Sequence, residues 1–396
     1  MLVEILIAIL IGIVCGIISG ITPGIHINLI SVLILTFSPF LLIYFSPLAL
    51  ASLIIAMGII HTFLDAIPSI FLGAPTEETA ISILPGHRML LEGKGYEAVM
   101  LTIFGTVTAL IISFLFIPLA LVLFPLVYEK IKIYIGIILL FIIGFLLLKE
   151  KSKLFSLMIF LMAGVLGIAT LNMGIKNVLF PLLSGLFGIS TLIISLKDKP
   201  VIPKQKITFP KLDKSSYKVS FISFITGAMC SFMPGLGPAQ GAVLGSQFIK
   251  KIQQKDFLIL VGGLSAVNFF LSLISLYKLE KARNGAVAIV LKLVNTINLK
   301  QFLILVSVTL IVLPIAVLLS VKLSKAFSFL ITKVNYQKLC LSIILFILIL
   351  TIFLCGIPGF LILLLSTLIG VIPQLANTPK NHLMGCLILP VLFYFL

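Results

Sequence analysis

The sequence has few charged residues and no tryptophan. Only 10% of its 396 residues are charged, whereas 61% are hydrophobic and the mean hydropathy is +1.31. This composition excludes an ordinary soluble domain, in which about a quarter of the residues are charged. No long stretch of the chain is polar, so a sizeable soluble domain beside a membrane part is also excluded. Nearly the whole chain is therefore expected to lie in a membrane.

The signature motifs of several enzyme classes are also missing. There is no H-E-x-x-H zinc motif, no C-x-x-C pair, no G-x-S-x-G segment and no GxxxxGK[ST] phosphate loop. The chain by itself therefore has no usual means of hydrolysing ATP, and any uphill transport must use an ion gradient or a partner. We predict that it is not an enzyme, that it has no metal site and that its only candidate cofactor is H⁺ or Na⁺ as a coupling ion.

Acidic residues are scarce, with 12 Asp and Glu against 28 Lys and Arg, which gives a formal net charge of +16. The lysines occur between apolar runs and do not form a basic face with interleaved aromatics. The charge therefore indicates membrane topology and contact with anionic lipid headgroups, and no nucleic acid is expected. Five cysteines lie in apolar segments without metal-ligand spacing and are predicted to be packing residues without a disulfide framework: Cys15, Cys230, Cys340, Cys355 and Cys386.

Long apolar runs recur from one end of the chain to the other. In lipid the backbone must satisfy its own hydrogen bonds, and unalternating runs near or above roughly 18 residues fit helices and not barrel strands. We predict an all-α polytopic protein of the cell membrane with about 10–12 membrane-embedded segments. The first run has no preceding Lys or Arg and no cleavage pattern, so we expect it to belong to the fold and not to a signal peptide.

The longest polar stretch, residues 197–218, contains seven lysines and divides the chain into two nearly equal halves. The positive-inside rule predicts that this linker faces the cytoplasm. Residues 1–196 and 219–396 are then two transmembrane halves, the arrangement expected of a duplicated transporter.

Each half begins with an apolar segment that is interrupted by a proline–glycine pair. Shifting the numbering by 211 positions places Gly227 on Gly16 and residues 234–235 on residues 23–24. Proline removes a backbone donor and glycine permits unusual backbone angles, so the pair ends or reverses a helix. Such a break is tolerated at membrane depth only where it is buried in protein or lines a wet cavity.

We predict that the two interruptions form helical hairpins whose tips enclose an anion at mid-depth. Lysines on both sides of residues 219–249 place the ends of the second hairpin in the cytoplasm, but the first hairpin, residues 5–45, has no flanking Lys or Arg. Inverted and parallel repeats therefore both stay open. Half-helix N-termini offer free N–H groups to an anion. The predicted substrate-binding residues at the tips are Thr22, Pro23, Gly24, His26, Pro234, Gly235 and Gly237.

His61 and Asp65 are four residues apart and share one face of the predicted helix. Asp65 has apolar runs on both sides, and an ionisable group at membrane depth is a functional hypothesis by default. The pair is predicted to couple the proton or sodium ion, with Asn28 and Asn268 as neutral ligands. The structural alternative is a His–Asp hydrogen bond that locks two helices together.

Several motifs resemble the large membrane subunit of tripartite tricarboxylate transporters, the TctA-like family. The "GITPGI" and "FMPGLGP" breaks match a proline–glycine break near the start of each family half. A family segment rich in glycine is echoed by Pro85, Gly86, Met89, Gly93, Gly95 and Ala98. The resemblance implies a permease for a small organic anion, typically a carboxylate, driven by a proton or sodium gradient. It also implies a small membrane subunit and an extracytoplasmic binding protein as partners; a second copy of the chain and membrane lipids are further candidates.

Two other functions stay open. A polyprenyl-phosphate or other lipid-phosphate translocase would also use paired hairpins, and it predicts a lateral opening to lipid and a Lys or Arg deep in the cavity. Both arginines, Arg88 and Arg283, lie near segment ends, and we assign no lysine to the interior. An intramembrane enzyme built on His61 and Asp65 would need a nucleophile or metal set that the sequence does not show.

Overall fold

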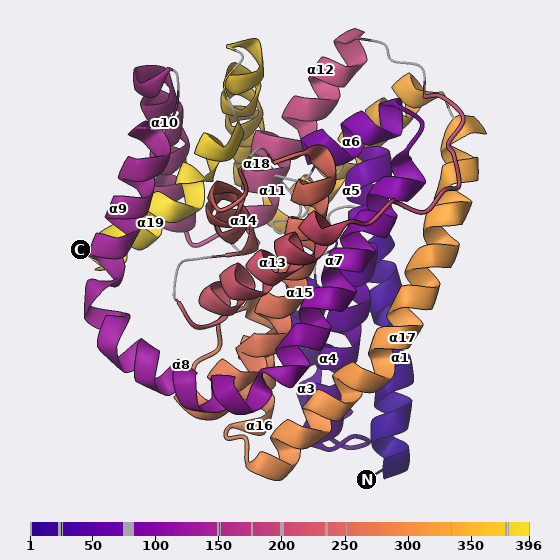
Figure 1. Cartoon of the computed structure of the whole chain (residues 1–396), viewed down its shortest axis with the longest axis vertical. Coiled ribbons are helices and arrows are strands. Elements are labelled where there is room, and N and C mark those ends of the chain that lie inside the picture. Colours follow the sequence, from indigo (N-terminus) through magenta and orange to yellow (C-terminus); the bar gives the residue numbers. More distant parts are fainter. Residues whose placement is uncertain are drawn as a thin grey trace.

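The computed structural model is an assembly of helices (Figure 1). It describes residues 2–22, 25, 27–73, 83–148, 150, 152–175, 177–198, 202–233, 237–250, 252–333, 335–376, 378 and 380–395. Within these ranges every regular element is a helix. Seven helical segments are long and apolar enough to cross a membrane: Leu2–Ile21, Pro47–Leu72, Gly95–Leu115, Lys153–Leu171, Gln254–Leu279, Leu299–Lys333 and Gln337–Leu375. Shorter apolar helices cover Gly136–Phe145, Leu179–Ile194, Gly285–Val294 and His382–Tyr394. The predicted all-α, multi-pass membrane fold is confirmed.

The α-helices of the described residues are α1 (Leu2–Ile21), α2 (Ile27–Thr36), α3 (Ser38–Leu41), α4 (Pro47–Leu64), α5 (Ala66–Leu72), α6 (Ile83–Leu91), α7 (Gly95–Leu115), α8 (Ile117–Ile131), α9 (Ile135–Leu148), α10 (Lys153–Leu171), α11 (Leu179–Leu183), α12 (Ser190–Asp198), α13 (Lys214–Phe232), α14 (Pro238–Gln247), α15 (Gln254–Leu279), α16 (Gly285–Val294), α17 (Leu299–Leu330), α18 (Tyr336–Leu375) and α19 (Gly385–Phe395). A π-helix, Ser184–Ile189, joins α11 to α12, and 3-10 helices cover Lys132–Tyr134, Ile331–Lys333 and Lys380–Met384.

α1 packs along α4 through three glycines spaced four residues apart. A Cβ atom at Gly16 would lie 2.6 Å from Ile60 Cβ and 2.8 Å from the Met57 carbonyl oxygen. Gly12 and Gly20 meet α4 in the same way, one turn before and one turn after. Apolar surface adds little to helix association in lipid, so small residues that let two backbones approach closely are a main source of contact energy.

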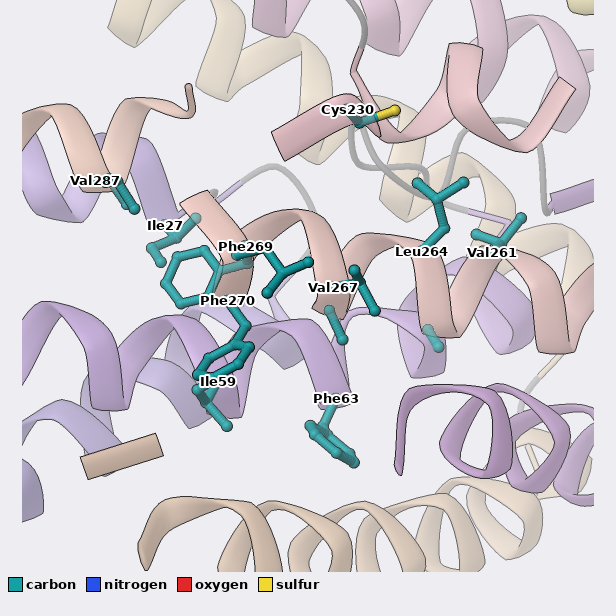
Figure 2. Close-up of a cluster of buried hydrophobic side chains, with 14 of the residues drawn as sticks. Ile27, Ile59, Phe63, Cys230, Val261, Leu264, Val267, Phe269, Phe270 and Val287 are labelled. Atoms are coloured by element: carbon teal, nitrogen blue, oxygen red, sulfur yellow. The ribbon is translucent and has the colours of Figure 1, made fainter. Parts of the chain in front are cut away.

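α4 and α15 form the centre of the molecule, and most residues of both helices are buried. Gly58 of α4 receives the ring of Phe269 from α15, which leaves no room for a side chain at position 58. Figure 2 shows Ile59 of α4 beside the ring of Phe270 from α15. α1 lies on the outer side of α4, and α7 and α13 pack against α15 (Figure 1). The central contact thus joins one helix from before the basic linker to one from after it.

A second group of helices lies beside this centre, where α10 packs against α19 and the π-helix packs against α18 (Figure 1). Glycines again set the close contacts: Gly167 of α10 abuts the backbone of Cys386, and Gly370 of α18 abuts that of Leu186. Both contacts pair an element before the basic linker with one after it. The two halves of the chain therefore interleave. Cys386 and the other four cysteines are free thiols.

The basic linker is held against the turn between α6 and α7. The Gly95 N–H donates to Gln205 Oε1 at 2.8 Å, and Gln205 Nε2 donates to the Leu90 carbonyl at 3.0 Å. The Phe209 ring packs edge-on against Tyr96, with 5.9 Å between centroids. This turn carries Gly93 and Gly95 of the segment that resembles the family, so the linker is anchored to that segment.

The first residues of α13 belong to the predicted linker stretch, because α13 begins at Lys214. Asp213 caps this helix by accepting from the Ser216 N–H at 2.9 Å, and its carboxylate accepts a hydrogen bond from Lys255 Nζ at 2.8 Å. The lysine and the cap hydrogen bonds lower the pKa of Asp213 to about 2. The cap defines where the helix that leads to the second interruption begins.

Candidate functional site

Both helices that were predicted to be interrupted end where the sequence places the break. α1 ends at Ile21 and α2 begins at Ile27, while α13 ends at Phe232 and α14 begins at Pro238. Shifting the bounds of α2 by 211 positions places them on the first and last residues of α14. Thr22 continues the hydrogen bonding of α1, since its N–H donates to the Ile18 carbonyl at 3.1 Å. Five of the predicted tip residues lie outside the described residues: Pro23, Gly24, His26, Pro234 and Gly235.

Each broken helix is hydrogen-bonded near its end to the long buried helix that follows it. Ser19 Oγ, in the last turn of α1, lies 3.0 Å from His61 Nδ1 of α4. In the other half, Ser275 Oγ of α15 donates to the carbonyl of Ser231 in the last turn of α13 at 2.6 Å. All four residues are buried. These contacts hold the two interrupted ends in defined positions against the protein interior.

Gly237 lies at the start of α14, immediately after the second interruption. Its carbonyl accepts from the Gly241 N–H at 3.0 Å and from Cys230 Sγ at 3.4 Å. The sulfur contact joins the end of α13 to the start of α14. The predicted tip residue is therefore part of an ordered first turn of the second half-helix.

His61 and Asp65 are buried where α4 ends, with 1% and 3% of their surfaces exposed. The Asp65 N–H donates to the His61 carbonyl at 2.9 Å, and the chain then enters α5. His61 contacts the end of α1 through Ser19. The structure thus places the predicted pair beside the first interruption. The imidazole contacts a serine hydroxyl on α1.

The two asparagines predicted as neutral ligands lie on different elements. Asn28 is in the first turn of α2, and its amide fills the space beside Gly285 at the start of α16, where a Cβ atom would lie 2.6 Å from Asn28 Oδ1. Asn268 is buried within α15, and its backbone carbonyl accepts from Ser272 Oγ at 2.6 Å. Asn28 therefore helps to seat the first half-helix against α16.

The comparisons with known proteins agree with this architecture. Residues 6–385 match the Tripartite tricarboxylate transporter TctA family. The chain belongs to this family. A protein of Methanocaldococcus jannaschii, whose name describes it as uncharacterized, is 33% identical over 360 residues, which are 87% of this chain and 88% of that protein. No solved structure matches the chain. The predicted family is confirmed, and the chain is a membrane-embedded component of a tricarboxylate transporter family.

The TctA family chain also contains a buried lysine that the sequence analysis missed. We had placed the lysines between apolar segments, but Lys380, in the 3-10 helix between α18 and α19, is only 7% exposed. Its Nζ donates to Ser190 Oγ at 3.0 Å and to Thr191 Oγ1 at 2.7 Å. Burial lowers the pKa of Lys380 to about 7. The statement that no lysine reaches the interior is therefore wrong for this residue.

The hydroxyls that contact Lys380 come from the first two residues of α12, directly after the π-helix Ser184–Ile189. A π-helical turn is uncommon and is frequently found at functional sites. No local sequence signal pairs these hydroxyls with Lys380, because 190 residues separate Ser190 from the lysine. The one available signal is the Asn-Thr-Pro sequence at residues 377–379, which interrupts an apolar stretch just before Lys380.

Proposed function

We propose that this TctA family member is a permease that moves a small organic anion, a di- or tricarboxylate, across the cell membrane. A proton or sodium gradient drives this transport. The observation that carries the proposal is the pair of helices interrupted after Thr22 and Met233, each hydrogen-bonded at its end to a buried helix. Free N–H groups at half-helix starts favour an anion. In this proposal the anion lies between the two interruptions, in contact with Thr22, His26, Gly237 and the proline–glycine residues.

His61 and Asp65 are the proposed coupling residues. An aspartate that is buried at membrane depth beside the first interruption is well placed to take up an ion when the anion binds. Asn28 and Asn268 are proposed as neutral ligands of the same ion. The identity of the ion, proton or sodium, is part of what the experiment below measures.

The two halves are proposed to be structural repeats. The equal spacing of the interrupted helices supports this proposal, since α2 and α14 have bounds that differ by 211 positions. Paired interruptions in corresponding places are typical of transporters built from repeats. A small membrane subunit and an extracytoplasmic binding protein are proposed as partners because the family takes its name from tripartite transporters.

The test is uptake of radiolabelled di- and tricarboxylates by the purified chain in liposomes, under an imposed proton gradient and then a sodium gradient. A parallel arm adds the small subunit and binding protein of the same organism. Wild type should accumulate at least one carboxylate under one gradient. Asp65→Asn should lose gradient-driven accumulation, down to the level of empty liposomes, but keep exchange of internal for external substrate, because only the coupling group is removed.

Glu92→Gln is the matched control, since Glu92 is an exposed carboxylate that pairs with Lys94 at 3.5 Å. It should leave accumulation unchanged. Full gradient-driven accumulation by Asp65→Asn would rule out the coupling role. Absence of carboxylate uptake by wild type in both arms would rule out the permease itself.

A lipid-phosphate translocase is the second candidate, because it requires a cation inside the protein and Lys380 meets that requirement. It predicts that a fluorescent polyprenyl phosphate exchanges between the leaflets of liposomes that contain the chain. Lipid exchange without carboxylate uptake would favour this candidate over the permease.

A further inference from the structure

Lys380 is a buried amine whose hydrogen-bond partners in the described part of the chain are neutral hydroxyls. Among the described residues, its Nζ contacts only the hydroxyls of Ser190 and Thr191, and no carboxylate pairs with it. In the same 3-10 helix, His382 Nε2 lies 3.3 Å from Glu150 Oε1, so this carboxylate contacts the histidine. Burying an ammonium group without a counter-charge is costly. A binding site for an anion would explain why a lysine occupies this buried position.

The hydrogen bonds of the two hydroxyls leave one N–H donor of Lys380 for another acceptor. Ser190 Oγ donates its hydrogen to the Leu186 carbonyl at 2.7 Å, and Thr191 Oγ1 donates to the Phe187 carbonyl at 2.5 Å. Both oxygens therefore act as acceptors toward Lys380. An ammonium has three donors, and two are used by these oxygens. The third has no partner among the described residues, and an oxyanion is the acceptor that would bind it most strongly.

The two hydroxyls follow directly after the π-helix Ser184–Ile189. The residues that accept from the two hydroxyls, Leu186 and Phe187, belong to the π-helix, and the donors begin α12 directly after it. Both hydroxyls thus lie on the side of the helix that faces the 3-10 helix of Lys380. Gln374 adds a weaker contact, with its Nε2 3.5 Å from Thr191 Oγ1.

The 3-10 helix that carries Lys380 lies beside the half-helix that follows the second interruption. The 3-10 helix Lys380–Met384 contacts α14, the half-helix that follows the break. α14 itself carries no charged residue, so it has no side chain that could neutralise an anion. The lysine therefore supplies a positive charge next to the half-helix that the proposed function places at the substrate.

We infer that Lys380, held by Ser190 and Thr191, binds an oxyanion group of the transported solute, a carboxylate in the proposed function. The inference rests on that proposed function for the solute, but the site itself is defined by oxyanion chemistry. This site would add a cationic contact to the substrate contacts predicted at the hairpin tips. The contact comes from the 3-10 helix between α18 and α19.

The test is isothermal titration of the purified full chain with citrate and, separately, with inorganic phosphate. Lys380→Met removes the charge and keeps an unbranched side chain, and should weaken binding at least about tenfold. Thr191→Val removes one hydroxyl and should weaken binding less. Lys300→Gln removes an exposed lysine in the first turn of α17 and should bind as wild type does. Thermal unfolding of each variant checks that it is folded; if Lys380→Met is unfolded, Thr191→Val takes over the test.

The outcomes separate this inference from the permease proposal. Citrate binding by wild type that Lys380→Met retains at full affinity would overturn the lysine site and leave the permease standing. Phosphate binding that depends on Lys380, without citrate binding, would support the site and count against a carboxylate solute. If wild type binds neither probe, the lysine site is wrong, whatever the uptake experiment shows.

Discussion

At the scale of single residues, three buried ionisable side chains lie where a helix ends or is irregular. His61 and Asp65 lie where α4 ends, and Lys380 lies in the 3-10 helix between two apolar segments. Regular membrane helices satisfy their own backbone hydrogen bonds and do not need such side chains. Ionisable side chains at helix ends are therefore the strongest candidates for a functional role.

The low pKa of Lys380 predicts a pH dependence of anion binding. The amine is protonated below about pH 7 and neutral above it, so affinity for a carboxylate that stays fully ionised should fall as the pH rises through about 7. Titration calorimetry from pH 6 to 9 measures this. Among the described residues, His382 is the titratable side chain next to Lys380 along the chain, and its Nε2 lies 3.3 Å from Glu150 Oε1.

His382→Gln is the control, and it should keep the same pH dependence. In the absence of ligand, the free energy of unfolding depends on pH in the opposite direction to the anion affinity. The folded chain releases the Lys380 proton near pH 7, whereas the unfolded chain holds it to the ordinary lysine pKa, so the free energy of unfolding should rise with pH between these values. Binding that is independent of pH in wild type would contradict protonation of Lys380 as the requirement.

At the scale of helices, close backbone contact at glycines stabilises the packing. A methyl group at Gly16 would meet Ile60 and the Met57 backbone at less than 3 Å, so α1 would have to move away from α4. We expect Gly16→Ala to lower the free energy of unfolding by about 1 to 3 kcal/mol, the usual range for overpacking. Thermal unfolding in detergent measures the change.

Gly144 of α9 provides the matched control, because a Cβ atom there would have no heavy atom of the described residues within 4 Å. Gly144→Ala should be neutral or stabilising by up to about 1 kcal/mol, since alanine is the better helix former. Equal effects of the two substitutions would show that the α1–α4 contact does not depend on the small residue.

At the scale of the whole molecule, the basic linker is a tether between the first half and α13. Gln205 joins it to the turn between α6 and α7 by two hydrogen bonds. Gln205→Ala should release this segment, and trypsin should then cleave after Lys204, Lys206 or Lys211 several times faster than in wild type. Mass spectrometry of the fragments measures the rate.

Thr208→Ala is the control within the same segment, because Thr208 is exposed. It should leave the cleavage rate unchanged. Equal rates in wild type and Gln205→Ala would mean that the amide contacts do not restrain the linker.

Prediction from sequence succeeded for features that depend on local chemistry. The apolar runs predicted membrane helices, and the proline–glycine pairs predicted where α1 and α13 end. The motifs predicted the family. Prediction from sequence did not find which residues contact one another in the candidate site. Ser19 reaches His61 across 42 residues, and the amide of Asn28 meets Gly285 on a helix in the other half. No spacing along the chain encodes these distances.

The sequence by itself determined that the chain lies in a membrane as helices, because long uncharged runs have no other way to satisfy their backbone in lipid. It also determined where the helices are interrupted, because proline and glycine act on their own backbone. Only the tertiary structure decided that the two halves interleave through α4 and α15 and that Lys380 is buried between the hydroxyls of Ser190 and Thr191. The physical reason is that burial and charge pairing depend on which helices pack together, and that packing is set by side-chain contacts across the whole chain.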